Sequence, residues 1–379
     1  MAYRIPFNRA SVVGSELAYV SEALEGGHIS GDGPFSRRCE TLLEQALGAP
    51  RVLMTTSCTH ALELAAALLQ IEPGDEVIVP AFTFVSTAAA FATRGARVVF
   101  CDIRPDTLNL DERRLDSLVT ERTKVIVPVH YAGVGCEMDA ILALAERKGL
   151  AVIEDNAHGL FGRYRGHPLG GFGVFATQSF HETKNFTCGE GGALVINDER
   201  FVPRSEVLRE KGTNRKAFFR GDVDRYTWVD EGSSYVLSDL LAAFLAAQLE
   251  ERETIQTARR NIWLAYAEGL LEWAASVGAT LPSVPGHCEQ PYHMFYLLLP
   301  TLEHRTALIE HLRRRGILAV FHYLPLNLSP MGKRHGGQRG QCPVTEDVAD
   351  RLLRLPFYTG LQPHVQAEVI EAALEFGGG

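Results

Sequence analysis

Between residues 51 and 197 the sequence alternates short runs of β-branched and aliphatic residues with longer stretches of helical period. This alternation is typical of βαβ units and predicts an α/β fold built on a mainly parallel sheet. The apolar runs are nearly continuous, so helices must cover both faces of the sheet. We predict strands at residues 51–54, 76–79, 98–102, 124–130, 151–154, 174–179 and 192–196, and helices at 59–70 and 138–147.

The alternation stops before residue 205, and the C-terminal third of the chain has a different pattern. Residues 236–275 are rich in Ala, Leu and Glu and predict one or two long helices. A strand at 294–299, a helix at 305–315, a strand at 318–322 and a final helix from Pro363 follow. We therefore predict a large α/β domain at residues 1–235, connecting helices at 236–280 and a small α+β domain at 281–379.

Charge and cysteine content limit the environment and the partners of the chain. The 379 residues carry a formal net charge of -9, which disfavours binding to nucleic acid or to anionic membranes. The seven cysteines form no C-x-x-C pair, and their odd number suits a reducing cytoplasm better than a secreted disulfide framework. No apolar run reaches the roughly 20 residues of a membrane span. We expect a cytoplasmic protein without nucleic-acid or membrane partners.

Common motifs for nucleotide binding, metal binding and serine hydrolysis are absent from the sequence. There is no G-x-G-x-x-G after a strand, no Walker phosphate loop and no G-x-S-x-G elbow. His181 and Glu182 begin a zinc motif, but Asn185 stands where its second histidine would be. We expect no metal site.

The first predicted strand runs directly into hydroxyl-bearing residues and a helix. Ser57, Cys58 and Thr59 lie at that helix start, where free backbone N–H groups and the helix dipole can bind a phosphate. Taken alone, this segment is better explained as an ordinary capped helix.

Two charged residues follow later strands of the predicted sheet. Asp155 comes directly after one buried strand, and Lys184 follows the next in the run Ser179 to Asn185. Alone, Asp155 fits a turn-capping carboxylate equally well, and a lysine is more often a solvated surface residue. Taken together, the helix start at residues 57–59, Asp155 and Lys184 match three groups of pyridoxal phosphate (PLP). The helix start would bind its phosphate, Asp155 its ring nitrogen and Lys184 its aldehyde. This conjunction favours a PLP site at the carboxyl ends of the strands.

Several longer sequence runs also resemble a known family of enzymes. The runs SGDGPFSRRCE (30–40), TSCTHALE (56–63), PGDEVIVPAFTFVSTA (73–88), SFHETKN (179–185) and AVFHYLPL (319–326) resemble the DegT/DnrJ/EryC1/StrS aminotransferases over essentially the whole chain. That family has the type I fold of PLP-dependent enzymes. The runs resemble most the members that aminate a dTDP-4-keto-6-deoxyhexose.

The resemblance implies roles for individual residues around the cofactor. Lys184 would form the Schiff base, and Asp155 would partner the pyridinium nitrogen. Phe84 would stack on the ring. His158 stands where close relatives have Gln, and its imidazole N–H can make the same hydrogen bond to the phenolic oxygen. The phosphate would be held by Ser57, Cys58, Thr59 and Ser179.

The resemblance also implies a homodimer with shared active sites. Ser234 lies where many sugar aminotransferases carry an Asn that reaches the neighbouring subunit's phosphate. Residues 211–225 carry five Lys and Arg against two Asp and resemble a diphosphate-binding segment; Arg215 and Arg220 are its candidate substrate residues. His322 resembles a position near the sugar, and a structural histidine is an equal alternative.

The sequence therefore predicts a PLP-dependent aminotransferase that moves an amino group from L-glutamate to a dTDP-4-keto-6-deoxyhexose. Amination of a 3-keto sugar or another nucleotide sugar is an alternative within the family. A dehydratase of the same family would carry His instead of Lys184, so the lysine argues against it. A noncatalytic PLP-binding regulatory protein is the alternative from another class.

Overall fold

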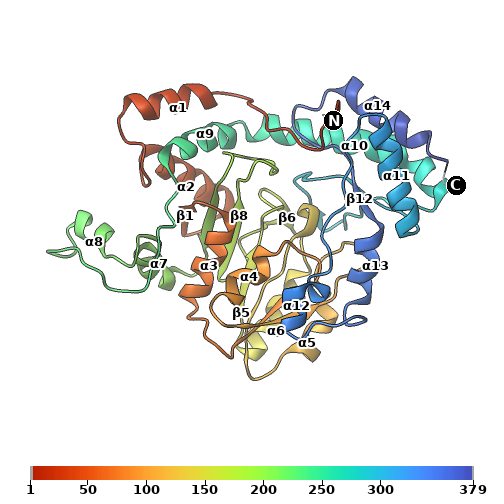
Figure 1. Ribbon diagram of the computed structural model, residues 1–379. Helices are drawn as coiled ribbons and strands as arrows, with labels where there is room; N and C mark the ends of the chain where they lie inside the picture. The colour runs from red at the N-terminus through yellow and green to blue at the C-terminus, as the bar shows by residue number, and fades with distance from the viewer. Residues whose placement is uncertain (1–2, 378–379) are drawn as a thin grey trace.

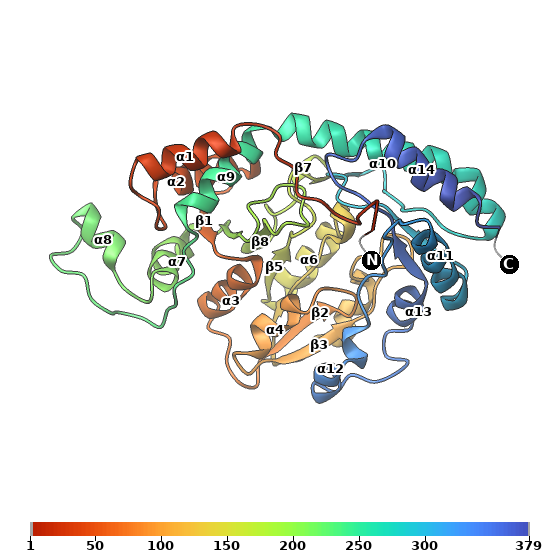
Figure 2. The same ribbon diagram turned by 45° about the horizontal axis from the view of Figure 1, so that its top comes forward.

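The computed structural model describes residues 3–377, and Figures 1 and 2 show it from two sides. Across those residues, seven strands form the central sheet in the order β1-β9-β8-β5-β4-β2-β3. The strands are β1 (Arg51–Thr55), β2 (Glu76–Pro80), β3 (Arg97–Cys101), β4 (Thr123–Ile126), β5 (Ala151–Asp155), β8 (Phe175–Ser179) and β9 (Gly192–Ile196). The predicted α/β class with a mainly parallel sheet is confirmed.

Strand β9 departs from the parallel arrangement. It runs antiparallel to both β1 and β8, with Gly192 opposite Thr55 on one side and Ser179 on the other. No helix intervenes between β8 and β9, so the chain re-enters the sheet at the edge where β8 ends. All other neighbouring strands pair in parallel.

Helices cover both faces of the sheet because successive strand residues point to opposite sides. Leu53 of β1 packs in the core under α3 (Cys58–Leu68) and α4 (Ser86–Ala92). Val52 and Met54 pack on the other face against α2 (Pro34–Leu47) and α9 (Asp239–Glu250). Farther along that face, α6 (Met138–Lys148) covers β4 and β5. The remaining helices of the N-terminal two thirds are α1 (Glu16–Glu25), α5 (Leu115–Leu118), α7 (Val202–Arg209) and α8 (Arg215–Arg220).

The C-terminal region forms a second core around a small sheet. This core is enclosed by α10 (Arg252–Val277), α11 (Leu302–Arg314) and α14 (Pro363–Leu374), with β11 (Tyr296–Leu298) and β12 (Leu352–Arg354) paired antiparallel. Figure 2 shows α10 and α14 side by side over it. Ile5 from the N-terminal segment is buried in the same core. The domain boundaries at 235 and 280 stay a prediction.

The other elements of the described chain are short. They are α12 (Pro330–Arg334), α13 (Pro343–Arg351), the two-residue strands β6 (Arg163–Tyr164), β7 (His167–Pro168) and β10 (Cys288–Glu289), and the 3-10 turns at Glu112–Arg114, Tyr131–Gly133, Glu199–Phe201 and Leu326–Leu328. No helix within residues 3–377 has the length and apolar character needed to cross a membrane.

Two predicted strands differ from the structure, and both lie near prolines. The strand predicted at 124–130 ends at Ile126, and Pro128 lacks the N–H that would continue a ladder. The strand predicted at 318–322 is wrong, because only Val320 makes a bridge, to Arg354 of β12. Since β12 has three residues and Pro356 follows shortly after it, it offers little edge to pair with.

A buried carboxylate fixes the loop that follows the strand carrying Asp155. Glu154 of β5 is fully buried and accepts hydrogen bonds from the backbone N–H groups of Gly170 at 2.8 Å and Gly173 at 2.9 Å. It also accepts one from Phe172 N at 2.7 Å and lies 2.9 Å from His130 Nε2. This one side chain therefore ties β5 to the chain that enters β8.

We expect Glu154→Gln to destabilise the protein by about 2–3 kcal/mol, because the amide N–H₂ would face backbone donors that now have an acceptor. Differential scanning calorimetry of the apoprotein would detect a thermal midpoint lowered by several degrees. The exposed Glu121→Gln is the matched control and should leave the midpoint unchanged. An unchanged midpoint for Glu154→Gln would contradict this account of the loop.

Candidate active site

The carboxyl ends of β1, β5 and β8 open into a cavity of about 820 Å³ between the central sheet and the C-terminal region. Nine of the twelve predicted site residues line it: Ser57, Cys58, Thr59, Phe84, Asp155, His158, Ser179, Lys184 and His322. Arg215, Arg220 and Ser234 line a second cavity instead. The structure thus places all the predicted cofactor residues except Ser234 in one cavity, and Ser234, Arg215 and Arg220 in the other.

One end of the large cavity is the start of α3. Ser57 caps this helix from an extended backbone, and its hydroxyl accepts a hydrogen bond from His60 N at 3.1 Å. Gly192 of β9 lies against the same turn, and a Cβ atom there would be 2.3 Å from the carbonyl carbon of Ser57. Only glycine allows this close approach, so the helix start remains next to the end of β8. Burial raises the pKa of the Cys58 thiol, which stays protonated.

Asp155 is 5% exposed, and its carboxylate is held from two sides. Thr87 Oγ1 donates to Oδ2 at 2.7 Å, and the N–H of Ala157 donates to Oδ1 at 3.2 Å. Thr87 is itself 2.9 Å from the hydroxyl of Thr83. The carboxylate is therefore oriented before any ligand binds, and it faces the cavity that Lys184 lines.

Lys184 lies in the loop that joins β8 to β9, and its backbone N–H donates to His181 O at 2.9 Å. Burial lowers the pKa of its amine to about 8, although the charge of the nearby Asp155 partly compensates. Within residues 3–377 no carboxylate lies within ion-pair distance of the amine. A buried amine with a lowered pKa has the properties of a nucleophilic lysine.

Aromatic side chains form the rest of the wall. Phe84 is 57% exposed at the cavity, with its ring centroid 6.4 Å from that of Tyr323. His158 stacks on His293 at 4.2 Å, and its Nε2 is 3.4 Å from the Tyr323 hydroxyl. The buried Nδ1 of His158 has no hydrogen-bond partner in the described chain. Such an unpaired polar atom at a cavity suits contact with a ligand.

His322 enters the cavity from the C-terminal region. Its Nδ1 lies 2.6 Å from the Tyr131 hydroxyl, and its ring stacks on Tyr323 at 3.6 Å. Burial holds the pKa of both His322 and His158 well below the ordinary value, so these imidazoles are neutral at pH 7. His322 therefore has a structural partner and also reaches the cavity.

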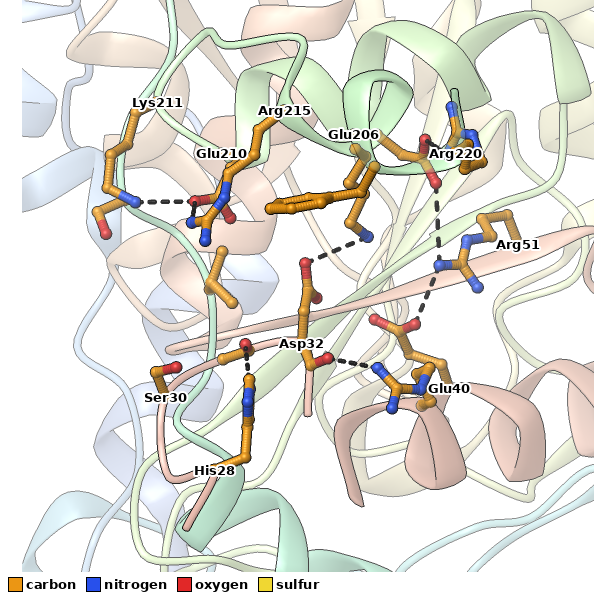
Figure 3. Close-up of a pocket in the computed structure, with 16 residues that line it drawn as sticks. His28, Ser30, Asp32, Glu40, Arg51, Glu206, Glu210, Lys211, Arg215 and Arg220 are labelled. Carbon is orange, nitrogen blue, oxygen red and sulfur yellow. Dashed lines mark hydrogen bonds and ion pairs between the residues drawn. The ribbon is translucent and has the colours of Figure 1, made fainter. Parts of the chain in front are cut away.

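The second cavity, of about 710 Å³, lies under α7 and α8, and Figure 3 shows its charged lining. Lys211 and Arg215 both point at Glu210, at 3.0 Å and 3.4 Å. Arg220 pairs with Glu206 at 2.7 Å. The lining carries six Lys and Arg and four Asp and Glu, a net charge of 6 − 4 = +2. This net positive charge is smaller than the charge count over residues 211–225 predicts, because Asp32, Glu40, Glu206 and Glu210 also line the cavity.

The sequence did not single out several residues of the large cavity. His293, Tyr323 and Arg354 all line it from the C-terminal region. Tyr323 follows His322 directly, so the FHY run carried a usable signal. The sequence around Arg354 carried no such signal, since this arginine lies in the run RLLRL (351–355), which has no distinctive pattern. Among residues 3–377, no group of His, Cys, Asp and Glu side chains is arranged to hold a metal ion.

The chain is similar to known proteins over nearly its whole length. A model of the DegT/DnrJ/EryC1/StrS aminotransferase family matches residues 11–374. The uncharacterized protein MJ1066 of Methanocaldococcus jannaschii is 32% identical over 375 residues, covering 97% of this chain and 96% of that protein.

Solved structures extend the likeness to the fold. Spr1654 of Streptococcus pneumoniae, a candidate sugar aminotransferase, superposes in its apo form with a TM-score of 0.91 at 28% identity, covering 98% of this chain and 97% of that one. It has also been solved in PLP and PMP (pyridoxamine phosphate) forms. 3-Amino-5-hydroxybenzoic acid synthase superposes with a TM-score of 0.88 at 28% identity, covering 99% of both chains.

The lowered pKa of Lys184 predicts when this amine reacts. At pH 7 about a tenth of the amines are neutral, against fewer than about one in a thousand for an ordinary lysine. The rate at which apoprotein takes up PLP covalently, trapped by borohydride, should therefore rise with pH through about 8 and level off near pH 9.

Peptide mapping of the trapped adduct checks this prediction. Lys184→Ala should trap none, and the exposed Lys148→Ala should behave as wild type. A rate that still rises beyond pH 10, or an adduct on another lysine, would overturn the assignment.

Proposed function

We propose that the chain, which belongs to the DegT/DnrJ/EryC1/StrS aminotransferase family, transfers an amino group from L-glutamate to the keto carbon of a dTDP-linked 4-keto-6-deoxyhexose. The family match and the structural neighbours establish the coarser statement, a PLP-dependent aminotransferase with the type I fold. The observation that carries the proposal is the buried Lys184 amine, which shares a cavity with Asp155 and the start of α3.

The residues of the cavity suit the cofactor. The N–H groups at the start of α3, with the hydroxyls of Ser57 and Thr59, suit its phosphate. The carboxylate of Asp155, already oriented by Thr87, suits a protonated ring nitrogen. The unpaired Nδ1 of His158 suits a hydrogen bond to the phenolic oxygen, and Phe84 suits stacking.

The chemistry that bound PLP supplies is an electron sink for negative charge on the carbon that gains or loses the amine. Asp155 holds the positive charge of the ring nitrogen in place, which keeps that sink effective. Lys184, once its amine is free and neutral, moves the proton to and from the reacting carbon. The aromatic wall limits access of water to this proton.

The second cavity supports a nucleotide-sugar substrate. A substrate with two phosphates needs a cationic surface, and Arg215 and Arg220 each bear about half of their side-chain surface exposed beside this cavity. Likeness of fold alone does not select the substrate, since 3-amino-5-hydroxybenzoic acid synthase shares it at the same identity. The proposal of a nucleotide-sugar substrate therefore depends on this cavity and on the sequence runs that resemble sugar aminotransferases.

The position of the second cavity supports the proposal of a homodimer with shared sites. Figure 1 shows α8 projecting away from the rest of the chain, beyond α7. Phe219, Tyr226 and Trp228 on this projection are 71%, 58% and 75% exposed. Aromatic surface gathered on a projection is typical of a protein–protein contact. We propose that a second copy of the chain covers it, bringing Ser234, Arg215 and Arg220 to the partner's large cavity.

We propose a cytoplasmic location on two observations. All seven cysteines are free thiols, and six of them are buried. Burial raises the pKa of several of these thiols well above the ordinary value, which suits a reduced and unreactive state.

The substrate proposal is tested with the purified holoenzyme. L-Glutamate should bleach the visible absorbance of the bound cofactor, and addition of a dTDP-4-keto-6-deoxyhexose should restore it. NMR of the product should show the new amine at C4. Amination only at C3, or only of a UDP-linked sugar, would replace the proposed substrate by another of the same family. Absence of bleaching with any amino acid would refute the proposed activity of this chain.

The shared site is tested with mixed dimers. Lys184→Ala chains and Arg215→Ala/Arg220→Ala chains should each be inactive with sugar nucleotide when pure. A hybrid would contain one site free of both defects, so activity should return to as much as about half that of a wild-type dimer. Arg313→Ala/Arg314→Ala chains, altered on α11 outside both cavities, are the matched control. Hybrids that form but recover no activity would show that each chain completes its own site.

A further inference from the structure

Arg354 is the last residue of β12 and lines the large cavity with Lys184. Its backbone is paired on both sides. It lies opposite Tyr296 of β11, and its N–H donates to Val320 O at 2.7 Å on the other edge. The side chain is therefore presented to the cavity from a backbone with little freedom to move.

The guanidinium of Arg354 is short of partners. It stacks on the ring of Phe7 at 4.6 Å, and Nη2 donates to Phe321 O at 3.2 Å. Its Nε is buried without a hydrogen-bond partner, and no carboxylate of residues 3–377 lies within 4.0 Å of the group. Arginine carries five N–H donors and a permanent charge, so most of this hydrogen-bonding capacity has no partner among residues 3–377. A partly buried, unpaired guanidinium is costly unless a ligand supplies the anion.

The other charged groups of the cavity already have tasks in the proposed reaction. The start of α3 faces the cofactor phosphate, Asp155 faces the ring nitrogen, and Lys184 reacts. Glu190 lies beside His181 at 3.6 Å. Burial keeps the imidazoles of His158, His293 and His322 neutral, because it holds their pKa well below the ordinary value. Arg354 is thus the cation of this cavity left for a substrate anion.

The two substrates differ in whether they carry such an anion beside the reacting carbon. An α-amino acid has its carboxylate bonded directly to that carbon. A 4-keto-6-deoxyhexose has a hydroxyl-bearing carbon on one side of its keto group and, on the other, the carbon that bears the ring oxygen and the methyl group. It has no carboxylate there, and its phosphates lie across the ring on C1. Arg354 lies close enough to the Lys184 amine for its positive charge to help lower the pKa of that amine.

We infer that Arg354 binds the α-carboxylate of the amino donor, and that the wall formed by Phe7, Phe321 and Arg354 is the donor subsite. The inference rests on the proposed aminotransferase activity. A planar guanidinium held by stacking can receive a carboxylate through two parallel N–H···O bonds. The donor half of the reaction therefore depends on Arg354, while the acceptor half does not.

The experiment compares two donors that differ only at this carboxylate. L-Glutamate and L-glutamate α-amide share the amine and the distal carboxylate. In wild-type holoenzyme, kcat/KM for cofactor bleaching should favour glutamate by at least about 30-fold, the range of a charge-assisted hydrogen-bonded pair. In Arg354→Gln this preference should fall to within about threefold, chiefly through KM for glutamate. Arg354→Lys, which keeps the charge but not the planar fork, should be intermediate.

Arg305→Gln is the matched control. Its guanidinium stacks on Phe321 at 5.7 Å from the same region but does not line the cavity. Calorimetric titration with glutarate gives a readout without turnover, and its affinity should fall at least about tenfold in Arg354→Gln only. If Arg354→Gln does not fold, the test uses Arg354→Lys instead, whose preference for glutamate over the α-amide should be smaller than that of the wild type.

An unchanged preference for glutamate in the folded Arg354 variants would overturn the inference. So would a wild-type enzyme that uses the α-amide as well as it uses glutamate. A wild-type enzyme that reacts with another amino acid is tested with the α-amide of that donor. If it reacts with none, the proposed function has failed, and this outcome is distinct from loss of the Arg354 assignment.

Discussion

The arrangement of this active site depends on the common direction of the strands that carry it. Because β1, β5 and β8 point the same way, their carboxyl ends meet at one edge, which brings the start of α3 to Asp155 and to the lysine loop. Parallel strands require covered faces, and the helices on both sides leave this edge as the opening. The C-terminal region closes over that opening and adds His322, Tyr323 and Arg354.

Electrostatics in the cavity follow from the same enclosure. Burial keeps the imidazoles of His158, His293 and His322 neutral, so the positive charge is concentrated on Lys184 and Arg354. The two cations come from different parts of the fold, Lys184 from the loop between β8 and β9 and Arg354 from β12. The cavity thus holds one cation for the cofactor and a second one, Arg354, for the donor carboxylate that we propose it binds.

Much of this site could be predicted because its signals are local. Asp155 and Lys184 each stand next to a strand that the sequence marks clearly, and a parallel sheet dictates that such ends converge. The reversed direction of β9 could not be predicted, since a buried strand has the same composition in either direction. The acids that face the basic segment could not be predicted either, since Asp32 and Glu40 come from the N-terminal part of the chain and meet the segment only in the folded protein. Arg354 depends on packing against Phe7, nearly the whole chain away, and no local pattern encodes such a contact.

The close approach of Gly192 to Ser57 has a consequence for how sequence variation in this protein is interpreted. Any Cβ at that position would collide with the backbone of Ser57 and Cys58, so even alanine there would force the start of α3 to move. In a deep mutational scan, substitutions at Gly192 would be tolerated as poorly as those at Lys184, although glycine has no functional group to contribute to the reaction. Intolerance to substitution and participation in the reaction are separate properties here, and only the three-dimensional geometry tells them apart.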